Sequence, residues 1–157
     1  MNAGRAERGR ARPAAGGADQ PWRIHFFQRH PDDDPRRATP ARDFLEACPT
    51  GVEADVVAVL KAVAQAPPPR FAGGGQWQAM HGTMKGFYEV RVTGPGRRRY
   101  RLFCFLDRDS PGLGGPSVVL IAGMHKAAGS GFAKADYARV EALGREYLSR
   151  CPRSVAR

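Results

Sequence analysis

The chain has 157 residues, a formal net charge of +10 at pH 7 and a hydrophobic share of 42%. This length suits one domain of ordinary size, and no stretch approaches the ~20 apolar residues of a membrane-spanning helix. The positive charge favours polyanionic partners, either nucleic acid or an acidic protein. We therefore expect a single basic, cytoplasmic domain with no membrane partner.

The two ends of the chain differ in composition from its middle. Residues 1–20 contain arginines among alanine and glycine but no aromatic or branched aliphatic residue. Such a segment lacks the apolar core of a secretory signal and cannot bury enough surface to offset the entropy of ordering. We predict a disordered basic tail over 1–20, one domain over 21–151 and a short C-terminal tail over 152–157.

The cysteines are odd in number and widely spaced, and they form no zinc-finger pattern: Cys48, Cys104 and Cys151. This usage is typical of reduced thiols in the cytoplasm. No catalytic Ser/His/Asp constellation, phosphate-binding glycine loop or paired carboxylate site stands out. The sequence therefore predicts no metal site and no cofactor.

The first half of the domain predicts one strand and two helices. Residues 22–27 alternate in the manner of a half-buried strand. Thr39 followed by Pro40 is typical of a helix start, and a capping box begins a second helix at Thr50. Its apolar residues, among them Val56 and Val63, recur at helical spacing until the prolines at 67–69. Because only a tight turn separates the two helices, we expect a helical hairpin.

The second half predicts a sheet and a last helix. Residues 84–92, 97–106 and 117–124 have strand character, and the first two are joined by a turn at 93–96. Residues 132–150 carry apolar side chains at helical spacing. The prediction is an α+β domain in which the helical hairpin and the C-terminal helix pack on a small, mainly antiparallel four-stranded sheet.

Arginines gather on one face of this predicted sheet. Strand side chains alternate, so Arg91 shares a face with Glu89, while Arg99 and Arg101 point away from the apolar side of their strand. We expect these three arginines to converge on a face that the helices leave open. Two further arginines would extend the positive rim at the hairpin, Arg97 and Arg98. The alternative is a solvated face on which Glu89 forms ordinary ion pairs.

Other candidates lie at the ends of strands. The last strand ends in His125 and Lys126, which could move protons beside the arginines, although a solvated turn is the alternative. Lys85 and His81 are weaker candidates by the same reasoning. Trp77 could be a base-stacking platform, but a tryptophan is more often a core residue.

Three segments of the second half have distinctive sequences. They read MKGFYEVR over 84–91, RYRLF over 99–103 and VLI over 119–121 with Lys126 beyond, and a terminal helix follows. Together they resemble the RelE/ParE superfamily of bacterial toxins, and most closely its phage-derived, HigB-like branch. The resemblance spans about 22–150 and implies helices on one side of a curved sheet with an open basic cleft. It implies a toxin of a type II toxin–antitoxin pair.

The resemblance also implies roles for individual residues. Arg91, Arg101 and Lys126 match basic residues of the family's strands, and Tyr137 lies in the region of a catalytic tyrosine, although its spacing also fits the core. RelE and HigB members cut mRNA on the ribosome without a metal, by attack of a ribose 2′-hydroxyl. Arg91 and Arg101 would then stabilise the phosphoryl oxygens.

The proton donor and acceptor of that reaction stay open among Lys126, Lys85 and His125. The expected partners are ribosome-bound mRNA and a cognate antitoxin, a helix-turn-helix protein. Two alternatives remain. ParE-like members inhibit DNA gyrase, and the same fold could serve as a non-catalytic module that binds nucleic acid or protein.

Overall fold

The computed structural model describes residues 20–66 and 75–157. The predicted tail, except Gln20, and the prolines at 67–69 lie outside the described residues. The elements in chain order are β1 (Arg23–Phe26), α1 (Pro40–Ala47), α2 (Thr50–Gln65), β2 (Trp77–Ala79), the 3-10 helix η2 (Gly82–Met84), β3 (Tyr88–Thr93), the 3-10 helix η3 (Pro95–Arg97), β4 (Arg99–Asp107), β5 (Ser117–Lys126) and α3 (Lys134–Ser149). Within the described part of the chain, no helix combines the length and apolar character needed to cross a membrane.

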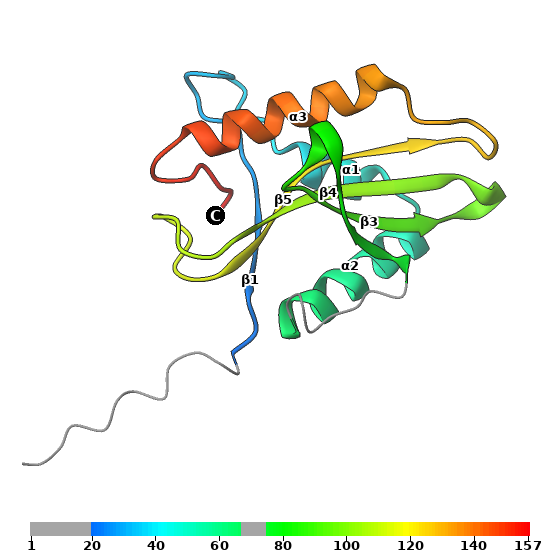
Figure 1. Ribbon diagram of the computed structural model, residues 1–157, viewed down its shortest axis with the longest axis horizontal. Coiled ribbons are helices and arrows are strands. Elements are labelled where there is room, and N and C mark those ends of the chain that lie inside the picture. Colours follow the sequence, from blue (N-terminus) through cyan, green and yellow to red (C-terminus); the bar gives the residue numbers. More distant parts are fainter. Residues whose placement is uncertain (1–19, 67–74) are drawn as a thin grey trace, which may run out of the picture.

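The strands form one mixed sheet in the order β1-β5-β4-β3-β2 (Figure 1). β1 is parallel to β5, and the other pairs are antiparallel. The predicted α+β class and mainly antiparallel sheet are confirmed, but the prediction of four strands is wrong. The additional strand is β2, which pairs with β3. At three residues it is too short to show an alternating pattern.

The start of β3 also differs from the prediction. The strand begins at Tyr88 instead of residue 84. The residues before it form the η2 turn, and Gly86 has a φ of +100°. This left-handed backbone favours glycine and interrupts a strand. Lys85 is consequently a turn residue and no part of the sheet.

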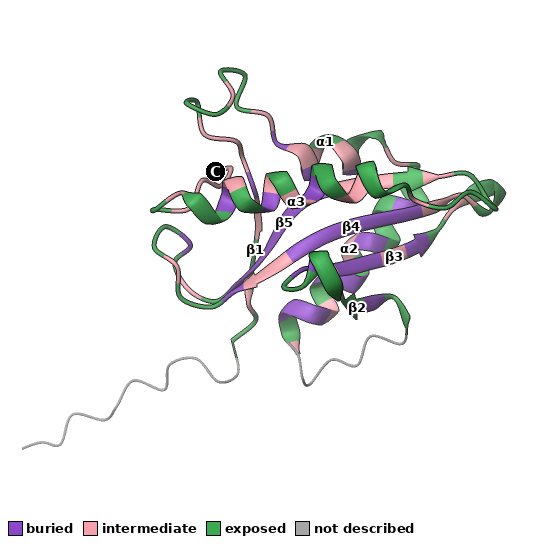
Figure 2. Cartoon of the chain, turned by 45° about the horizontal axis from the view of Figure 1, so that its top comes forward, coloured by how far each residue is buried: buried purple, intermediate pink, exposed green. Residues whose placement is uncertain are grey.

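Helices cover both faces of the sheet, so the expected one-sided arrangement is wrong. α1 and α2 pack on one face through a core that includes Leu45, Val56 and Leu102. α3 packs on the other face through a second core that includes Phe103 and Val140. β4 and β5 are apolar on both sides and are buried along most of their length (Figure 2). Two apolar faces require two covering layers.

A β-bulge in β5 decides which way the end of that strand faces. Phe103 pairs with Ala122, but the next residue, Cys104, pairs with Leu120, so Ile121 is an extra residue. An extra residue reverses the alternation of side chains beyond it. Residues after the bulge therefore face the opposite side from the one that counting through the strand gives.

The C-terminal residues pair with the edge of the sheet. The Ala156 N–H donates to the Phe26 carbonyl at 2.9 Å, and the Gln28 N–H donates to the Ser154 carbonyl at 3.2 Å. Val155 packs against the second core. Residues 152–157, predicted to be a short C-terminal tail, thus lie against the domain and cover part of β1.

A polar network holds the end of α3 on the sheet. The Tyr147 hydroxyl donates to the Asp107 carboxylate at 2.7 Å, and both residues are buried. Arg153 Nε lies 3.4 Å from the same carboxylate. At the α3 surface, the Arg29 guanidinium donates three hydrogen bonds to Glu146, at 2.8, 2.9 and 3.2 Å. These contacts fix the position of α3 along β4.

Candidate nucleic-acid interface

Three arginines lie on the α3 face of β3 and β4, as the alternation predicts. Arg91 and Arg101 are direct cross-strand partners, and Arg99 lies one alternate position along β4, opposite Thr93. Like charges opposite each other in a sheet are destabilising. An arrangement that brings three guanidinium groups together therefore requires a compensating negative charge.

Glu89 supplies that charge. One of its carboxylate oxygens lies 3.4 Å from Arg91 Nε, and the other lies 3.9 Å from Arg101 Nε. The side chains of Glu89 and Arg101 are 9% and 8% exposed, whereas that of Arg91 is 40% exposed. The structure thus separates a buried pair, Glu89 with Arg101, from an arginine that can reach a ligand.

Burial shifts the pKa of both members of the buried pair. Desolvation raises the pKa of the Glu89 carboxyl, although Arg91 and Arg101 partly oppose this shift. Desolvation also lowers the pKa of Arg101, and the neighbouring Arg91 charge lowers it further. Both shifts have the sign expected where ionised groups are removed from water. Burial thus outweighs the ion pairs for both groups, although two arginines lie within 4 Å of one carboxylate.

The loop between β5 and α3 lies over these arginines. The Phe132 ring centroid is 5.8 Å from the Arg99 guanidinium carbon and 5.6 Å from that of Arg101. Arg99 also donates a hydrogen bond to the Ser130 carbonyl. Its Nε is buried and has no hydrogen-bond partner in the described part of the chain. The Phe132 ring thus covers Arg99 and Arg101 through cation–π contacts, and Arg99 Nε is a hydrogen-bond donor without an acceptor in the described residues.

Tyr137 borders the same cluster from the first turns of α3. Its ring packs edge to face on Phe103, with centroids 6.0 Å apart, and on Phe132, at 6.3 Å. Burial raises the pKa of the Tyr137 hydroxyl, and the Glu89 charge raises it further. The phenol therefore stays protonated at neutral pH.

Lys126 is on the arginine face as well. It pairs across the sheet with Arg99, and its Nζ lies 3.4 Å from the Asp136 carboxylate. That carboxylate also accepts the Ala133 N–H at 2.8 Å, at the start of α3. Lys126 therefore joins the end of β5 to the start of α3 at the rim of the cluster.

His125 points to the other side of the sheet because it lies beyond the bulge. It stacks on Tyr100 with ring centroids 5.4 Å apart, and Arg98 donates to its Nδ1 at 2.8 Å. Tyr100 belongs to the core under α1 and α2. The structure therefore does not bring His125 or Arg98 together with Arg91 and Arg101. Arg97 lies at the exposed tip of the β3–β4 hairpin.

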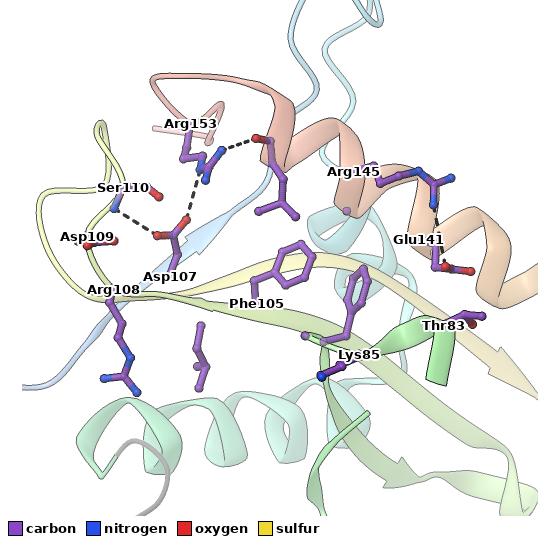
Figure 3. Close-up of a pocket in the computed structure, with 15 residues that line it drawn as sticks. Thr83, Lys85, Phe105, Asp107, Arg108, Asp109, Ser110, Glu141, Arg145 and Arg153 are labelled. Atoms are coloured by element: carbon purple, nitrogen blue, oxygen red, sulfur yellow. Dashed lines mark hydrogen bonds and ion pairs between the residues drawn. The ribbon is translucent and has the colours of Figure 1, made fainter. Parts of the chain in front are cut away.

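Lys85 lines a different pocket, of about 610 Å³, at the far end of β4 (Figure 3). Phe105, Asp107 and Arg145 line the same pocket, and the ring of Phe87 packs closely on Gly144 there. His81 is exposed in the turn before η2. Neither residue contributes to the arginine cluster.

Trp77 is a core residue. It is 5% exposed, belongs to the core under α2 and stacks on Tyr88 with centroids 5.1 Å apart. It therefore lies on the opposite face from the arginines, which favours the core interpretation over a base-stacking platform.

Sequence reasoning missed two members of the cluster as site residues. Glu89 was placed on the correct face by alternation but only as an ordinary ion-pair partner. Phe132 was predicted to begin the last helix, but α3 begins at Lys134 and Phe132 lies in the preceding loop, whose path depends on where α3 docks. In the described residues, no group of His, Cys, Asp or Glu is arranged to hold a metal ion.

Comparison with known proteins adds one structural likeness. No family model matches the chain, and no curated protein matches its sequence. Among solved structures, the toxin–antitoxin complex RelBE2 from Mycobacterium tuberculosis is similar to this chain, with 19% sequence identity and a TM-score of 0.43. The match covers 69% of this chain and 94% of that chain. At this level the similarity assigns neither a family nor a function to this chain.

Proposed function

We propose that this protein is the toxin of a type II toxin–antitoxin pair and that it cleaves mRNA on the ribosome without a metal ion. One observation carries the proposal: Arg91 and Arg101 share a single buried carboxylate, and Arg99, a phenol and a lysine lie beside them. This arrangement holds excess positive charge next to groups that can transfer protons. It suits a phosphodiester substrate.

The proposed reaction begins with attack of a ribose 2′-oxygen on the adjacent phosphorus. The bond from phosphorus to the 5′-oxygen breaks, which leaves a 2′,3′-cyclic phosphate and a free 5′-hydroxyl. Negative charge accumulates on the phosphoryl oxygens in the transition state. Arg91 is the arginine best placed to bind these oxygens, because its side chain is 40% exposed, whereas that of Arg101 is 8% exposed. The buried Arg101 would stabilise the same negative charge electrostatically, without direct contact with the RNA.

Proton transfer requires one group to accept the 2′-hydroxyl proton and another to donate to the leaving 5′-oxygen. Of the three predicted candidates, Lys126 alone lies on this face; Lys85 and His125 lie elsewhere. We assign the base to Glu89, because a carboxyl with a raised pKa accepts protons more readily near neutral pH. This role requires the bound phosphate to draw Arg91 away from the buried carboxylate and so expose it. Tyr137 or Lys126 is the proposed acid.

Access to the site depends on Phe132. Because this ring lies over Arg99 and Arg101, the RNA must displace it or stack a base on it. The two glycines that precede it in the loop, Gly129 and Gly131, would permit such movement. An antitoxin would protect the cell by covering the same positive face.

The test is induction of the full-length chain in bacterial cells, followed by mapping of RNA ends that carry a 5′-hydroxyl. We expect growth arrest with new 5′-hydroxyl ends inside translated mRNA. The Arg91→Ala variant should produce neither. Growth arrest without new ends would instead favour a gyrase inhibitor, and normal growth at confirmed expression would favour a non-catalytic binding module.

A further inference from the structure

The second half of β5 has a strand neighbour on one side only. β1 pairs with β5 from Ser117 to Leu120, whereas β5 continues to Lys126. After β1 the chain turns away, and the Arg29 N–H bonds to the Ala38 carbonyl across a loop. Among residues 20–66 and 75–157, nothing pairs with residues 121–126 on the β1 side. Unpaired edges of this kind can accept another chain.

The backbone groups that face this edge follow from the hairpin. The Gly94 N–H bonds to the Arg98 carbonyl, so alternate residues of β4 beyond it, Tyr100 and Leu102, also bond to β3. Arg99, Arg101 and Phe103 must then bond to their β5 partners, Lys126, Met124 and Ala122. The remaining residues of β5, Gly123 and His125, therefore direct their N–H and C=O groups to the open edge.

A groove of about 970 Å³ runs along this edge, between α1 on one side and α3 on the other. Its apolar walls are formed by Pro40, Phe44, Ala47, Tyr100, Met124 and Leu143. The Phe44 ring lies directly on Gly123, where any Cβ would overlap it. The groove therefore offers backbone hydrogen bonds at its floor and apolar contacts on both walls, which is what a bound extended strand requires.

The charges of the groove are mostly positive. Arg98 and Arg139 line it, and the Arg29 charge is neutralised by Glu146. Asp43 is the one acidic residue in the lining. Acidic side chains on an added strand would therefore find positive partners at the rim of the groove.

We propose that the open edge of β5 and its groove bind an extended, acidic peptide segment of a partner protein, which pairs with Gly123 and His125 as an added strand. This proposal is independent of RNA cleavage. The groove opens beside β5, whereas the proposed cleavage site lies on the α3 face of β3 and β4.

The first test measures hydrogen exchange of individual backbone amides in the free, full-length protein. We expect the Gly123 and His125 amides to exchange at least tenfold faster than those of Ala122 and Met124, which bond to β4. Slow exchange at Gly123 and His125 would show that the edge is already occupied and would overturn the proposal. Protection that grows with protein concentration, with dimers in sedimentation, would assign the edge to a second copy and overturn it as well.

The second test adds a fluorescent peptide of alternating valine and glutamate. We expect binding that protects the Gly123 and His125 amides, and loss of binding when alternate peptide nitrogens are methylated. A peptide with lysine in place of glutamate should bind at least tenfold more weakly. No binding at peptide concentrations on the order of 1 mM, or equal binding of the methylated or lysine peptide, would overturn the proposal.

A matched pair of variants examines the edge from the protein side. His125→Pro removes one outward N–H without removing a hydrogen bond to β4, whereas His125→Ala keeps that N–H. We expect the proline variant to lose at least tenfold in affinity for the glutamate peptide relative to the alanine variant. Equal affinities would overturn strand addition. The methylated peptide gives the same answer on the unaltered protein if the proline variant does not fold.

Discussion

β4 carries two groups of charged side chains on the face that α3 covers, one near each end of the strand. At one end, Asp107 accepts a hydrogen bond from Tyr147 at 2.7 Å and lies 3.4 Å from Arg153 Nε. At the other end, Arg91 and Arg101 share the single carboxylate of Glu89, and Arg99 lies beside them along β4. Both groups lie under the same helix and beside a tyrosine of that helix.

The two groups differ in how completely their charges and hydrogen-bonding groups are paired. In the Asp107 group, the negative charge has an arginine partner and hydrogen-bond donors from Tyr147 and the Ser110 backbone. In the arginine group, three positive charges exceed one negative charge, and Arg99 Nε has no partner within the described residues. A satisfied network stabilises a fold, whereas an unbalanced one costs stability and is kept for function. This difference favours α3 anchoring by the first group and supports the proposed role of the second group in RNA binding.

The largest expected effect concerns the arginine group. Arg91→Ala should lower RNA cleavage by about 10²–10³-fold, because it removes one donor to the transition state. The free energy of unfolding should change by only about 0–1 kcal/mol, since the Arg91 side chain is 40% exposed. RNA-end mapping and urea unfolding measure the two quantities. Arg145→Ala, which removes an exposed charge from α3, is the control and should leave cleavage unchanged. A stable Arg91→Ala protein with full cleavage would disprove the assignment.

The opposite pattern is expected for the Asp107 group. Asp107→Ala leaves the buried Tyr147 hydroxyl without its acceptor and Arg153 without its charge partner, so unfolding should become easier by about 2–3 kcal/mol. Cleavage per folded molecule should not change. Urea unfolding is the measurement, and Asp109→Ala, at an exposed neighbouring position, is the control. A loss below about 0.5 kcal/mol would mean that the network does not anchor α3.

The stabilising effect of Asp107 should depend on pH. Burial by itself would raise the pKa of Asp107, but hydrogen bonds from Ser110 and Tyr147 hold it below the ordinary value of 3.8. A carboxyl with a lowered folded-state pKa stabilises the protein above that ordinary value, and the stabilisation is lost as pH falls through the folded-state pKa. The difference in free energy of unfolding between the unsubstituted protein and Asp107→Asn should therefore be constant from neutral pH to about pH 4. Below about pH 4 this difference should shrink. Urea midpoints across this range test the sign, and a gap that widens in acid would contradict it.

The smallest effects come from the two tyrosines, which form a matched pair. Tyr147→Phe removes one buried hydrogen bond and should cost about 1 kcal/mol of stability without changing cleavage. Tyr137→Phe removes a hydroxyl with no hydrogen bond in the described structure, so stability should change little. Cleavage should fall by at least about tenfold if Tyr137 donates the proton. Tyr137→Phe with native cleavage would leave Lys126 as the proposed acid.

Much of the site follows from periodicity in the sequence. Alternation along β3 and β4 put Arg91, Arg99 and Arg101 on one face, and the structure agrees. The apolar spacing of α2 likewise identified buried residues such as Val56 and Val63. These predictions succeed because side-chain direction repeats every two residues in a strand and every 3.6 in a helix, which depends only on local geometry.

Contacts between distant segments decided the direction of His125, the face that α3 covers and the position of Phe132. The bulge at Ile121 turned His125 away from the arginines and toward Tyr100, because it changes register with β4, a strand distant in sequence. α3 covered a face that was expected to be open, because β4 and β5 are apolar on both sides and each side must be buried. Phe132 reached Arg101 only through the docking of that helix. Strand register and helix docking are set by contacts between distant segments, and a single sequence read locally does not specify them.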